Sequence, residues 1–408
     1  MNEKLIVKNF GPIREAELDL KKVTIFIGPQ GSGKSTLAKF VAICKDSHFL
    51  CDAFIGKSFT EYFTKYQANF FLNENTSFSF DTERYFSAYN KTDGFDLDIK
   101  TPKNIFFGKT SAPYTNLTLK DLKNFWQSVQ ERIKRGTTSM NTAFSNQVLP
   151  VLIENLNKIT HKTKYLPTDR LLISSISDSI LGLLSAEVAL QKSTVDFGRD
   201  FEIARSKIPK LFIDYLNITY KYENGRNLVF HNETDSVPLS ASASGYQSVI
   251  PLHLTVEHFA KEEDTLFIVE EPELNLYPIT QKELIGYLTD RCTKGDNQLL
   301  INTHSPYVLS SLNILLFAYQ VANKYPESAD EVAKIVPREQ WLNPDDFAAY
   351  YVGEDKNGNK GGIHSIFDRD KQTQLIGENE LDEVSDELGD EFNELMNIYR
   401  TKKRETVN

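Results

Sequence analysis

The segment VTIFIGPQGSGKSTLAKFVA, residues 23–42, constrains the fold of this chain more than any other. Its first five residues are apolar, as in a buried strand, and a helical pattern follows the glycine-rich turn. Residues 28–35 match the pattern G-x-x-x-x-G-K-[ST], whose glycines let backbone N–H groups surround phosphates at a helix N-terminus. We therefore expect a nucleotide-binding domain built on a parallel sheet.

The residues of this loop have separate expected roles. Lys34 would reach the β- and γ-phosphates of ATP, and the Ser35 hydroxyl would bind Mg²⁺. The other contacts to the nucleotide are expected from Gly28, Pro29, Gln30, Gly31, Ser32, Gly33 and Thr36. The sequence thus predicts ATP and Mg²⁺ as cofactors.

Two further apolar segments end in residues suited to phosphate chemistry. LFIVEEPE ends with Glu270 and Glu271, at the edge where parallel sheets bind ligands. Glu270 is expected to bind Mg²⁺ directly or through water, and Glu271 to orient and deprotonate the attacking water. LLINTHSP ends with His304, which is expected to contact the γ-phosphate. An acidic pair alone is weak evidence for a catalytic site. Together with a phosphate loop in the same chain, it becomes strong evidence.

A second anion site is predicted where Ser244 and Gly245 begin a helical pattern, with Gln247 in its first turn. A single active site seldom needs two phosphate-binding helix ends from one chain. The second helix end is therefore expected to serve the nucleotide of a neighbouring molecule.

Composition limits the other functions open to the chain. With 408 residues it can hold two or three domains, and its net charge of −10 disfavours attraction of the whole surface to nucleic acid. A local basic groove that binds nucleic acid stays an open alternative. The three cysteines form neither a metal-ligand pattern nor a disulfide framework, the N-terminus lacks the pattern of a secretory signal, and no apolar stretch reaches the ~20 residues that span a bilayer. We expect a cytoplasmic protein with no membrane partner.

The four motifs occur in the order seen in ABC-type ATPases, and the chain resembles the branch that contains RecF, SMC heads and the OLD-like "AAA" ATPases of bacterial defence systems. The segments IVKNFGPIREAELDL and NLVFHNETDSVPLSASASGYQSVIPL resemble the OLD-like group in particular. The resemblance implies a head-to-tail homodimer, or a higher homo-oligomer, with ATP held between protomers. Lys34 and Ser35 of one chain would face Ser244 of the other.

Some positions depart from the pattern of that group. They are Gln30, Ala243, Tyr246, Glu270, Asn275 and Tyr277. None removes a group essential to hydrolysis, although turnover could be slow. The glutamine loop of this class has one candidate stretch, Tyr165–Arg170.

The expected fold class is α/β, a P-loop NTPase of the ABC-ATPase head type with an antiparallel β subdomain and a mainly helical insertion. The ATPase core is expected at residues 1–44 and 161–313, and the insertion of mixed strands and helices at 45–160. Residues 314–408 would form a C-terminal helical region with an acidic segment. Alternation in residues 76–100 predicts antiparallel strands, and Asn224-Gly225 predicts a hairpin turn. The aromatic residues concentrated between Phe49 and Phe107 are expected to pack in a core.

A nuclease domain of the Toprim kind is not expected, because Glu354 lies only 14 residues before Asp368 of the pair Asp368-Arg369-Asp370. The first hypothesis is therefore a Mg²⁺-dependent ATPase that controls a separate effector, a nuclease or toxin, in bacterial anti-phage defence. A DNA-repair or DNA-binding ATPase of the RecF/SMC kind is one alternative. An assembly scaffold that binds ATP without hydrolysing it is the other.

Overall fold

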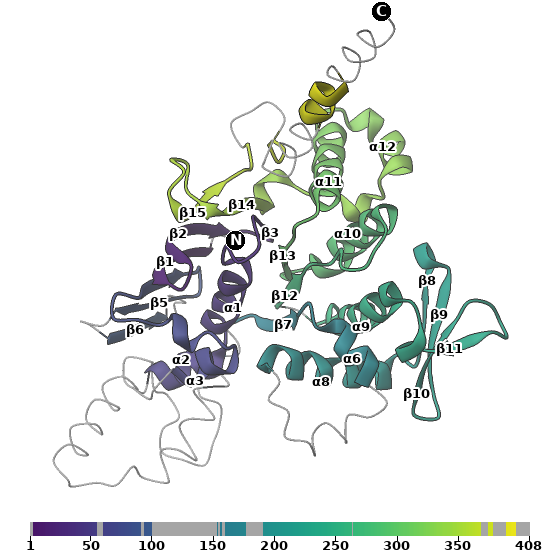
Figure 1. The fold of residues 1–408 in the computed structure, drawn as a ribbon, viewed down its shortest axis with the longest axis horizontal. Coiled ribbons are helices and arrows are strands. Elements are labelled where there is room, and N and C mark those ends of the chain that lie inside the picture. Colours follow the sequence, from purple (N-terminus) through teal and green to yellow (C-terminus); the bar gives the residue numbers. More distant parts are fainter. Residues whose placement is uncertain are drawn as a thin grey trace, which may run out of the picture.

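The computed structural model describes residues 3–54, 60–90, 94–99, 153, 156, 160–176, 191–262, 264–368, 374–377 and 389–396. Three sheets account for the strands within these ranges. Two of them are antiparallel and lie on opposite sides of the third, the core sheet (Figure 1).

The core sheet has six strands in the order β15-β14-β3-β13-β12-β7. Neighbouring strands pair in parallel, except that β15 pairs antiparallel with β14. Every residue of β3, β12 and β13 is buried, as expected for strands covered on both faces. The strands are β3 (Val23–Ile27), β7 (Lys162–Leu166), β12 (Thr265–Glu270), β13 (Gln298–Asn302), β14 (Phe347–Glu354) and β15 (Lys360–Ser365).

Alternate residues of the core strands pack into two hydrophobic cores. In β3, Phe26 joins the core that contains α1 (Lys34–Cys44), whereas Ile25 and Ile27 join the core on the other face. Helices on that other face include α8 (Lys192–Lys207), α9 (Ser244–Phe259), α10 (Pro278–Cys292) and α11 (Pro306–Lys324). Three short helices complete this part of the description: α3 (Thr60–Lys65), α6 (Arg170–Ile176) and α12 (Ala329–Ile335).

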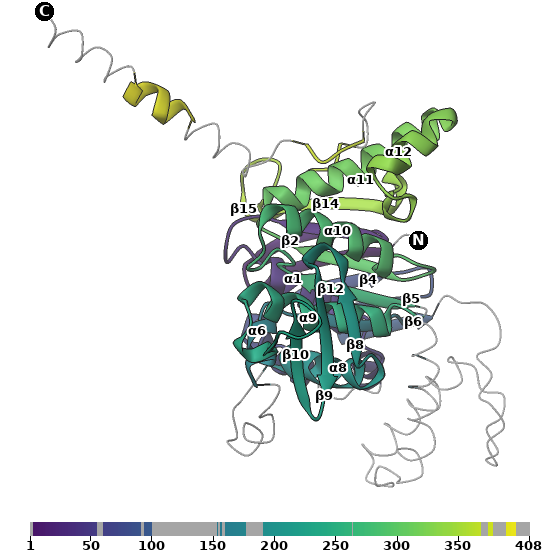
Figure 2. The ribbon, with the colours of Figure 1, turned by 90° about the vertical axis from the view of Figure 1, so that its right-hand side faces the viewer.

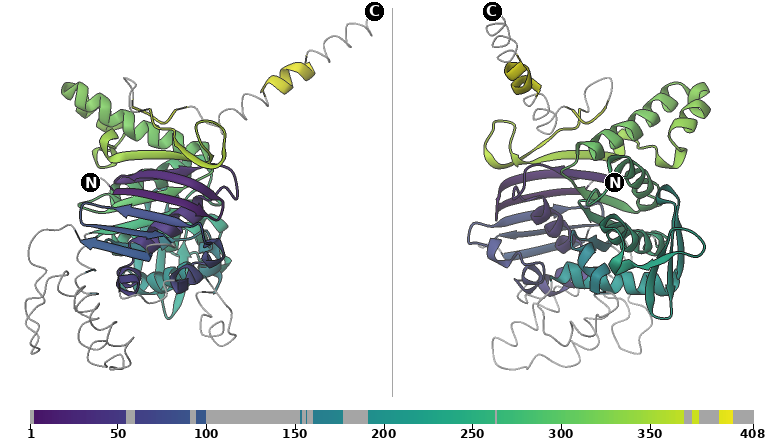
Figure 3. Two further views of the ribbon diagram at one scale, coloured as in Figure 1. Left: turned by 90° about the vertical axis from the view of Figure 1, so that its left-hand side faces the viewer. Right: turned by 45° about the vertical axis from the view of Figure 1, so that its right-hand side comes forward.

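The first antiparallel sheet has the order β2-β1-β4-β5-β6 and stands in front in the left view of Figure 3. The alternation in residues 76–100 does form antiparallel strands. They extend the sheet begun by the N-terminal hairpin, so part of the expected insertion 45–160 is continuous with the region before it. The strands are β1 (Glu3–Phe10), β2 (Ile13–Leu20), β4 (Ser77–Asp81), β5 (Tyr85–Asn90) and β6 (Gly94–Ile99).

Several aromatic residues of this region are packed in the core, as expected, whereas Phe70 is 68% exposed. Phe49, which lies in α2 (Ser47–Phe54), makes edge-on contact with Phe63, and Phe78 makes edge-on contact with Phe40. All four side chains are buried. The predicted helical part of the insertion, with the aromatic residues near Phe107, lies outside the described residues.

The second antiparallel sheet has the order β11-β10-β9-β8 and faces the viewer in Figure 2. The predicted hairpin turn is confirmed, because Asn224 (φ 52°) and Gly225 (φ 76°) join β9 to β10 with two positive φ angles. The strands are β8 (Lys210–Ile213), β9 (Ile218–Glu223), β10 (Arg226–Phe230) and β11 (Ser236–Pro238).

The C-terminal region differs from the expected helical one. Phe347 of β14 pairs with Val23 of β3, so the core sheet takes a strand from beyond residue 313. The first six residues of β14 are buried, because the strand lies inside the sheet. Most of the acidic segment, residues 378–391, lies outside the described residues. No described helix is long and apolar enough to cross a membrane.

Candidate nucleotide-binding site

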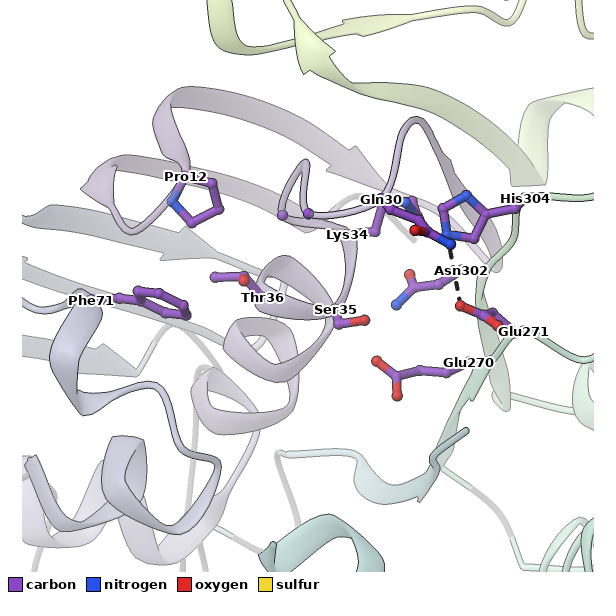
Figure 4. A pocket seen from close by; sticks show the side chains of 12 residues that line it. Pro12, Gln30, Lys34, Ser35, Thr36, Phe71, Glu270, Glu271, Asn302 and His304 are labelled. Atoms are coloured by element: carbon purple, nitrogen blue, oxygen red, sulfur yellow. Dashed lines mark ion pairs between the residues drawn. The ribbon is translucent and has the colours of Figure 1, made fainter. Parts of the chain in front are cut away.

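A cavity of about 630 Å³ lies where β3, β12 and β13 end (Figure 4). It is lined by residues from three of the four predicted motifs, together with the β1–β2 turn and Phe71. The lining residues are Pro12, Gln30, Gly31, Gly33, Lys34, Ser35, Thr36, Phe71, Glu270, Glu271, Asn302 and His304. The order of the parallel strands, rather than nearness in sequence, brings these groups together.

The loop that follows β3 needs glycine at two positions for steric reasons. Gly28 has φ 140°, and a Cβ there would lie 2.0 Å from the carbonyl oxygen of Val352 in β14. Gly33 has φ 110°, and a Cβ there would lie 2.5 Å from Ile13 Cδ1. The loop is therefore enclosed by β14 on one side and by the β1–β2 hairpin on the other.

Lys34 is buried at the first position of α1, with 6% of its surface exposed. Its Nζ donates hydrogen bonds of 2.8 Å to the carbonyl oxygens of Gly28 and of Pro29. Burial lowers the pKa of Lys34 to about 8, although Glu271, Glu273 and Glu270 act to raise it. A phosphate placed at this loop would add a further negative charge beside the buried ammonium.

Glu270, the last residue of β12, is buried and held by a tyrosine of the neighbouring strand. Its Oε1 accepts a hydrogen bond of 2.8 Å from the hydroxyl of Tyr165 in β7. Burial raises the pKa of Tyr165, so this hydroxyl stays a donor. The carboxylate of Glu270 therefore has a fixed orientation at the cavity wall.

Glu271 has an unusual backbone, with φ 42° in the left-handed region. Its N–H donates to the carbonyl oxygen of Asn302 (2.8 Å), and its own carbonyl accepts from Nη2 of Arg170 (2.7 Å). Its carboxylate lies 3.7 Å from Nε2 of His304. Two strands and a buried arginine thus hold the strained conformation that directs the Glu271 side chain into the cavity.

His304 follows β13 and is positioned through its backbone. Glu273 Oε1 accepts hydrogen bonds from the His304 N–H (2.9 Å) and from the Thr303 hydroxyl (2.7 Å). Burial lowers the pKa of His304, Lys34 lowers it further, and Glu271 opposes both effects. A lowered pKa favours the neutral imidazole, whose ring has one N–H donor and one acceptor nitrogen.

Arg170 is a structural element of this site that sequence reasoning missed. The side chain is fully buried and donates to the carbonyl oxygens of Pro167, Glu270 and Glu271, and to the Ser248 hydroxyl of α9. From its sequence, the stretch Tyr165–Arg170 is predicted only as a candidate glutamine loop. Its contribution here is a tyrosine, which holds Glu270 at the end of β12, and an arginine, which holds the carbonyls of Glu270 and Glu271.

Ser244, Gly245 and Gln247 do not line the cavity. Ser244 is exposed at the start of α9, while the Nε2 of Gln247 donates to the carbonyl oxygen of Ser242 (2.7 Å). A Cβ on Gly245 would lie 3.0 Å from the carbonyl oxygen of Asn275. Helices α1 and α9 lie on opposite sides of the core sheet (Figure 1). Within one protomer, the second predicted anion site is therefore separated from the phosphate loop.

A phosphate loop on a core sheet, with an acidic pair and a histidine at the ends of neighbouring strands, defines a P-loop ATPase. The predicted α/β fold class with an antiparallel β subdomain is thereby confirmed. The chain belongs to the AAA ATPase domain family, whose model matches residues 1–183 and 50–309. No curated protein matches the chain.

Solved structures to which the chain is similar include SMC head domains. One is the SMC head domain from Thermotoga maritima, at 13% identity and a TM-score of 0.37, covering 76% of this chain and 91% of that one. Another is the Smc head domain with an extended coiled coil bound to the C-terminal domain of ScpA, derived from Pyrococcus furiosus. It has 11% identity and a TM-score of 0.34, with the same two coverages.

Proposed function

We propose that this protein is a Mg²⁺-dependent ABC-type ATPase that hydrolyses ATP to ADP and phosphate. The observation that carries the proposal is the single cavity that gathers Lys34, Glu271 and His304 from three separate motifs. Lys34 and the loop N–H groups would bind the phosphates.

The residues present also fit a Mg²⁺ ion. The hydroxyl of Ser35 and the carboxylate of Glu270 line the same cavity and are hard oxygen ligands. In addition, the cavity contains a buried amide, that of Asn302, with no protein partner in the described part of the chain. Ser35 and Glu270 would hold the ion, which would neutralise charge on the β- and γ-phosphates when bound.

The remaining chemistry belongs to Glu271 and His304. As water attacks the γ-phosphorus and the bond to the bridging oxygen of ADP breaks, Glu271 accepts the proton of the water. The fixed backbone of Glu271 holds the carboxylate toward the cavity. His304, whose Nε2 lies 3.7 Å from the Glu271 carboxylate, contacts the γ-phosphate.

The exposed start of α9 supports composite sites in a homodimer or higher homo-oligomer. Ser244, Gly245 and Gln247 of one protomer would contact the nucleotide bound at Lys34 of another, as the resemblance to ABC-type ATPases implies. ATP occupancy would then be coupled to the geometry of the assembly.

The wider role proposed is control of a separate effector, a nuclease or toxin, in the cytoplasm during anti-phage defence. The positions of the acids that a Toprim nuclease site would need support this role. Glu354 ends β14, and Asp368 follows the β14–β15 hairpin of the core sheet, so no separate domain lies between them. Asp370 lies outside the described residues.

The Glu271→Gln variant tests the catalytic assignment. It is expected to keep ATP binding and to lose hydrolysis, because an amide cannot accept the proton, and to accumulate the closed dimer. Phosphate release and light scattering with ATP measure these outcomes against the wild type. Hydrolysis at the wild-type rate would show that Glu271 is not the base.

The same assays separate the alternatives. A wild-type protein that dimerises with ATP and releases no phosphate would be an assembly scaffold. Salt-dependent binding of duplex DNA would favour a RecF/SMC-like role. Degradation of nucleic acid by the purified protein alone, or affinity purification from its own cells without a stoichiometric partner, would contradict control of a separate effector.

A further inference from the structure

Asn302, the last residue of β13, has an unusual environment for a buried amide. Only 2% of its surface is exposed, and neither Oδ1 nor Nδ2 has a hydrogen-bond partner among the described residues. A buried amide whose donors and acceptor are both unpaired costs folding free energy, and such groups in native proteins call for an explanation.

The position of Asn302 in the sheet shows where its partners would come from. The strand register sets it beside Glu270 of β12 and Phe26 of β3, and its own carbonyl is used by the Glu271 N–H. In Figure 4 the side chain lies above Glu270 and beside Glu271, and it points toward the end of α1 that carries Ser35. The amide thus faces the cavity, where a bound nucleotide would place its terminal phosphate.

Another buried amide close to the opposite end of β13 provides a contrast. Asn297 is 1% exposed, but its Oδ1 accepts from the Thr265 N–H (2.9 Å) and its Nδ2 donates to the Ala260 carbonyl (3.1 Å). Asn297 therefore has the pairing of a structural amide. In the part of the chain that the structure describes, Asn302 is the one buried asparagine or glutamine with both side-chain atoms unpaired.

We propose that Asn302 contacts the γ-phosphate of ATP and its hydrated Mg²⁺, and so distinguishes ATP from ADP. Its N–H₂ group donates to a γ-phosphate oxygen, and its carbonyl oxygen accepts from a metal-bound water. A neutral side chain suits this place, because a third carboxylate beside Glu270 and Glu271 would repel the phosphate. The inference rests on the proposed function and adds a residue that reads the terminal phosphate.

The Asn302→Leu variant tests this inference, since leucine is similar in size and has no polar atoms. The Tm of the nucleotide-free variant is expected to equal or exceed that of the wild type, because two unpaired buried groups are removed. Its affinity for ATP with Mg²⁺ should fall about tenfold or more, as expected for hydrogen bonds to charged groups. Its affinity for ADP with Mg²⁺ should stay within about twofold, because ADP lacks the contacted phosphate. Calorimetric titration and thermal unfolding supply these values.

Asn297→Leu is the matched control. It should lower the Tm, because the Thr265 N–H and the Ala260 carbonyl lose their partner, and it should leave the ratio of ATP to ADP affinity unchanged. Asn302→Ala repeats the test with a smaller side chain, in case leucine does not fit.

The outcomes that overturn the inference are distinct. Unchanged ATP affinity in both Asn302 variants, or an equal loss of ATP and ADP affinity, would show that this amide does not read the γ-phosphate. A loss of Tm in both variants as large as that of Asn297→Leu would make it a structural amide. Failure of the wild type to bind ATP would refute the proposed function itself.

Discussion

At the scale of single residues, the buried state of Lys34 predicts how nucleotide binding depends on pH. Its pKa of about 8 means that the nucleotide-free ammonium loses its proton above that pH. ATP phosphates favour the charged form, so binding near pH 8.5 should take up a proton, and ATP affinity should fall as pH rises above about 8. Calorimetry in two buffers of different ionisation enthalpy measures the uptake.

Two comparisons check the assignment to Lys34. At pH 6.5 the wild type should take up little or no proton at this residue, because Lys34 is already charged. Lys34→Ala should lose ATP binding outright, since it lacks the cation that faces the phosphates. Proton uptake that is as large at pH 6.5 as at pH 8.5 would point to another group.

Lys34 also affects folding, with a definite sign. The folded pKa of about 8 lies below the ordinary value of 10.5, so between these pH values the unfolded chain holds more protons than the folded one. The contribution of Lys34 to the free energy of unfolding therefore rises with pH across this window. Phosphate binding removes this effect, because it raises the folded pKa.

The site residues that belong to a short sequence motif could be predicted from the sequence. The loop Gly28–Thr36, the acids Glu270 and Glu271, and His304 each follow an apolar strand pattern. The two acids, the histidine and all of the loop except Gly28, Pro29 and Ser32 line one cavity. Asn302 and Arg170 could not be predicted in this way. Their surroundings come from strand order and from a contact to α9, which no pattern within a short segment records.

At the scale of elements, the contact between the phosphate loop and β14 predicts unequal effects of two glycine substitutions. A Cβ on Gly28 would overlap the Val352 carbonyl, whereas a Cβ on Gly31 (φ 74°) meets nothing within 4 Å. Gly28→Ala should destabilise the protein by at least about 2 kcal/mol and weaken ATP binding, because loop or strand must move. Gly31→Ala should cost only about 1–2 kcal/mol of left-handed strain.

Thermal unfolding and ATP titration of the two variants measure this difference. Equal behaviour of Gly28→Ala and Gly31→Ala would mean that β14 does not support the loop.

Element prediction succeeded where neighbours in space are neighbours in sequence. The hairpin at Asn224-Gly225 and the helix that begins at Ser244 are examples. The place of β14 could not be inferred, although FAAYYVGE begins with the apolar run of a buried strand. Pairing with β3 joins segments more than 300 residues apart, and nothing within either segment specifies the partner.

At the scale of the whole molecule, the separation of Ser244 from the phosphate loop predicts complementation between inactive variants. Lys34→Ala and Ser244→Arg should each abolish hydrolysis as homodimers. A mixed dimer would contain one site with both defects and one intact site. Random exchange of equal amounts should therefore restore about a quarter of the wild-type rate, since half of the dimers are mixed.

Phosphate release from the two variants, alone and mixed, measures the restoration, and native mass measurement confirms that mixed dimers form. A mixture of Lys34→Ala with Glu271→Gln is the control, because both residues lie in the same cavity of one chain. That mixture should stay inactive. Mixed dimers of the first pair without activity would place Ser244 and Lys34 in the same half-site.

The place of β3 between β13 and β14 also bears on synthesis of the protein at the ribosome. Roughly 320 residues separate Ile27 from Phe347, which takes on the order of 16–64 s at about 5–20 residues per second. Until then the strand before the phosphate loop has an unpaired edge, open to association with other nascent chains. Chaperones that cover such edges during translation would therefore matter more for this protein than for one whose phosphate loop is completed early.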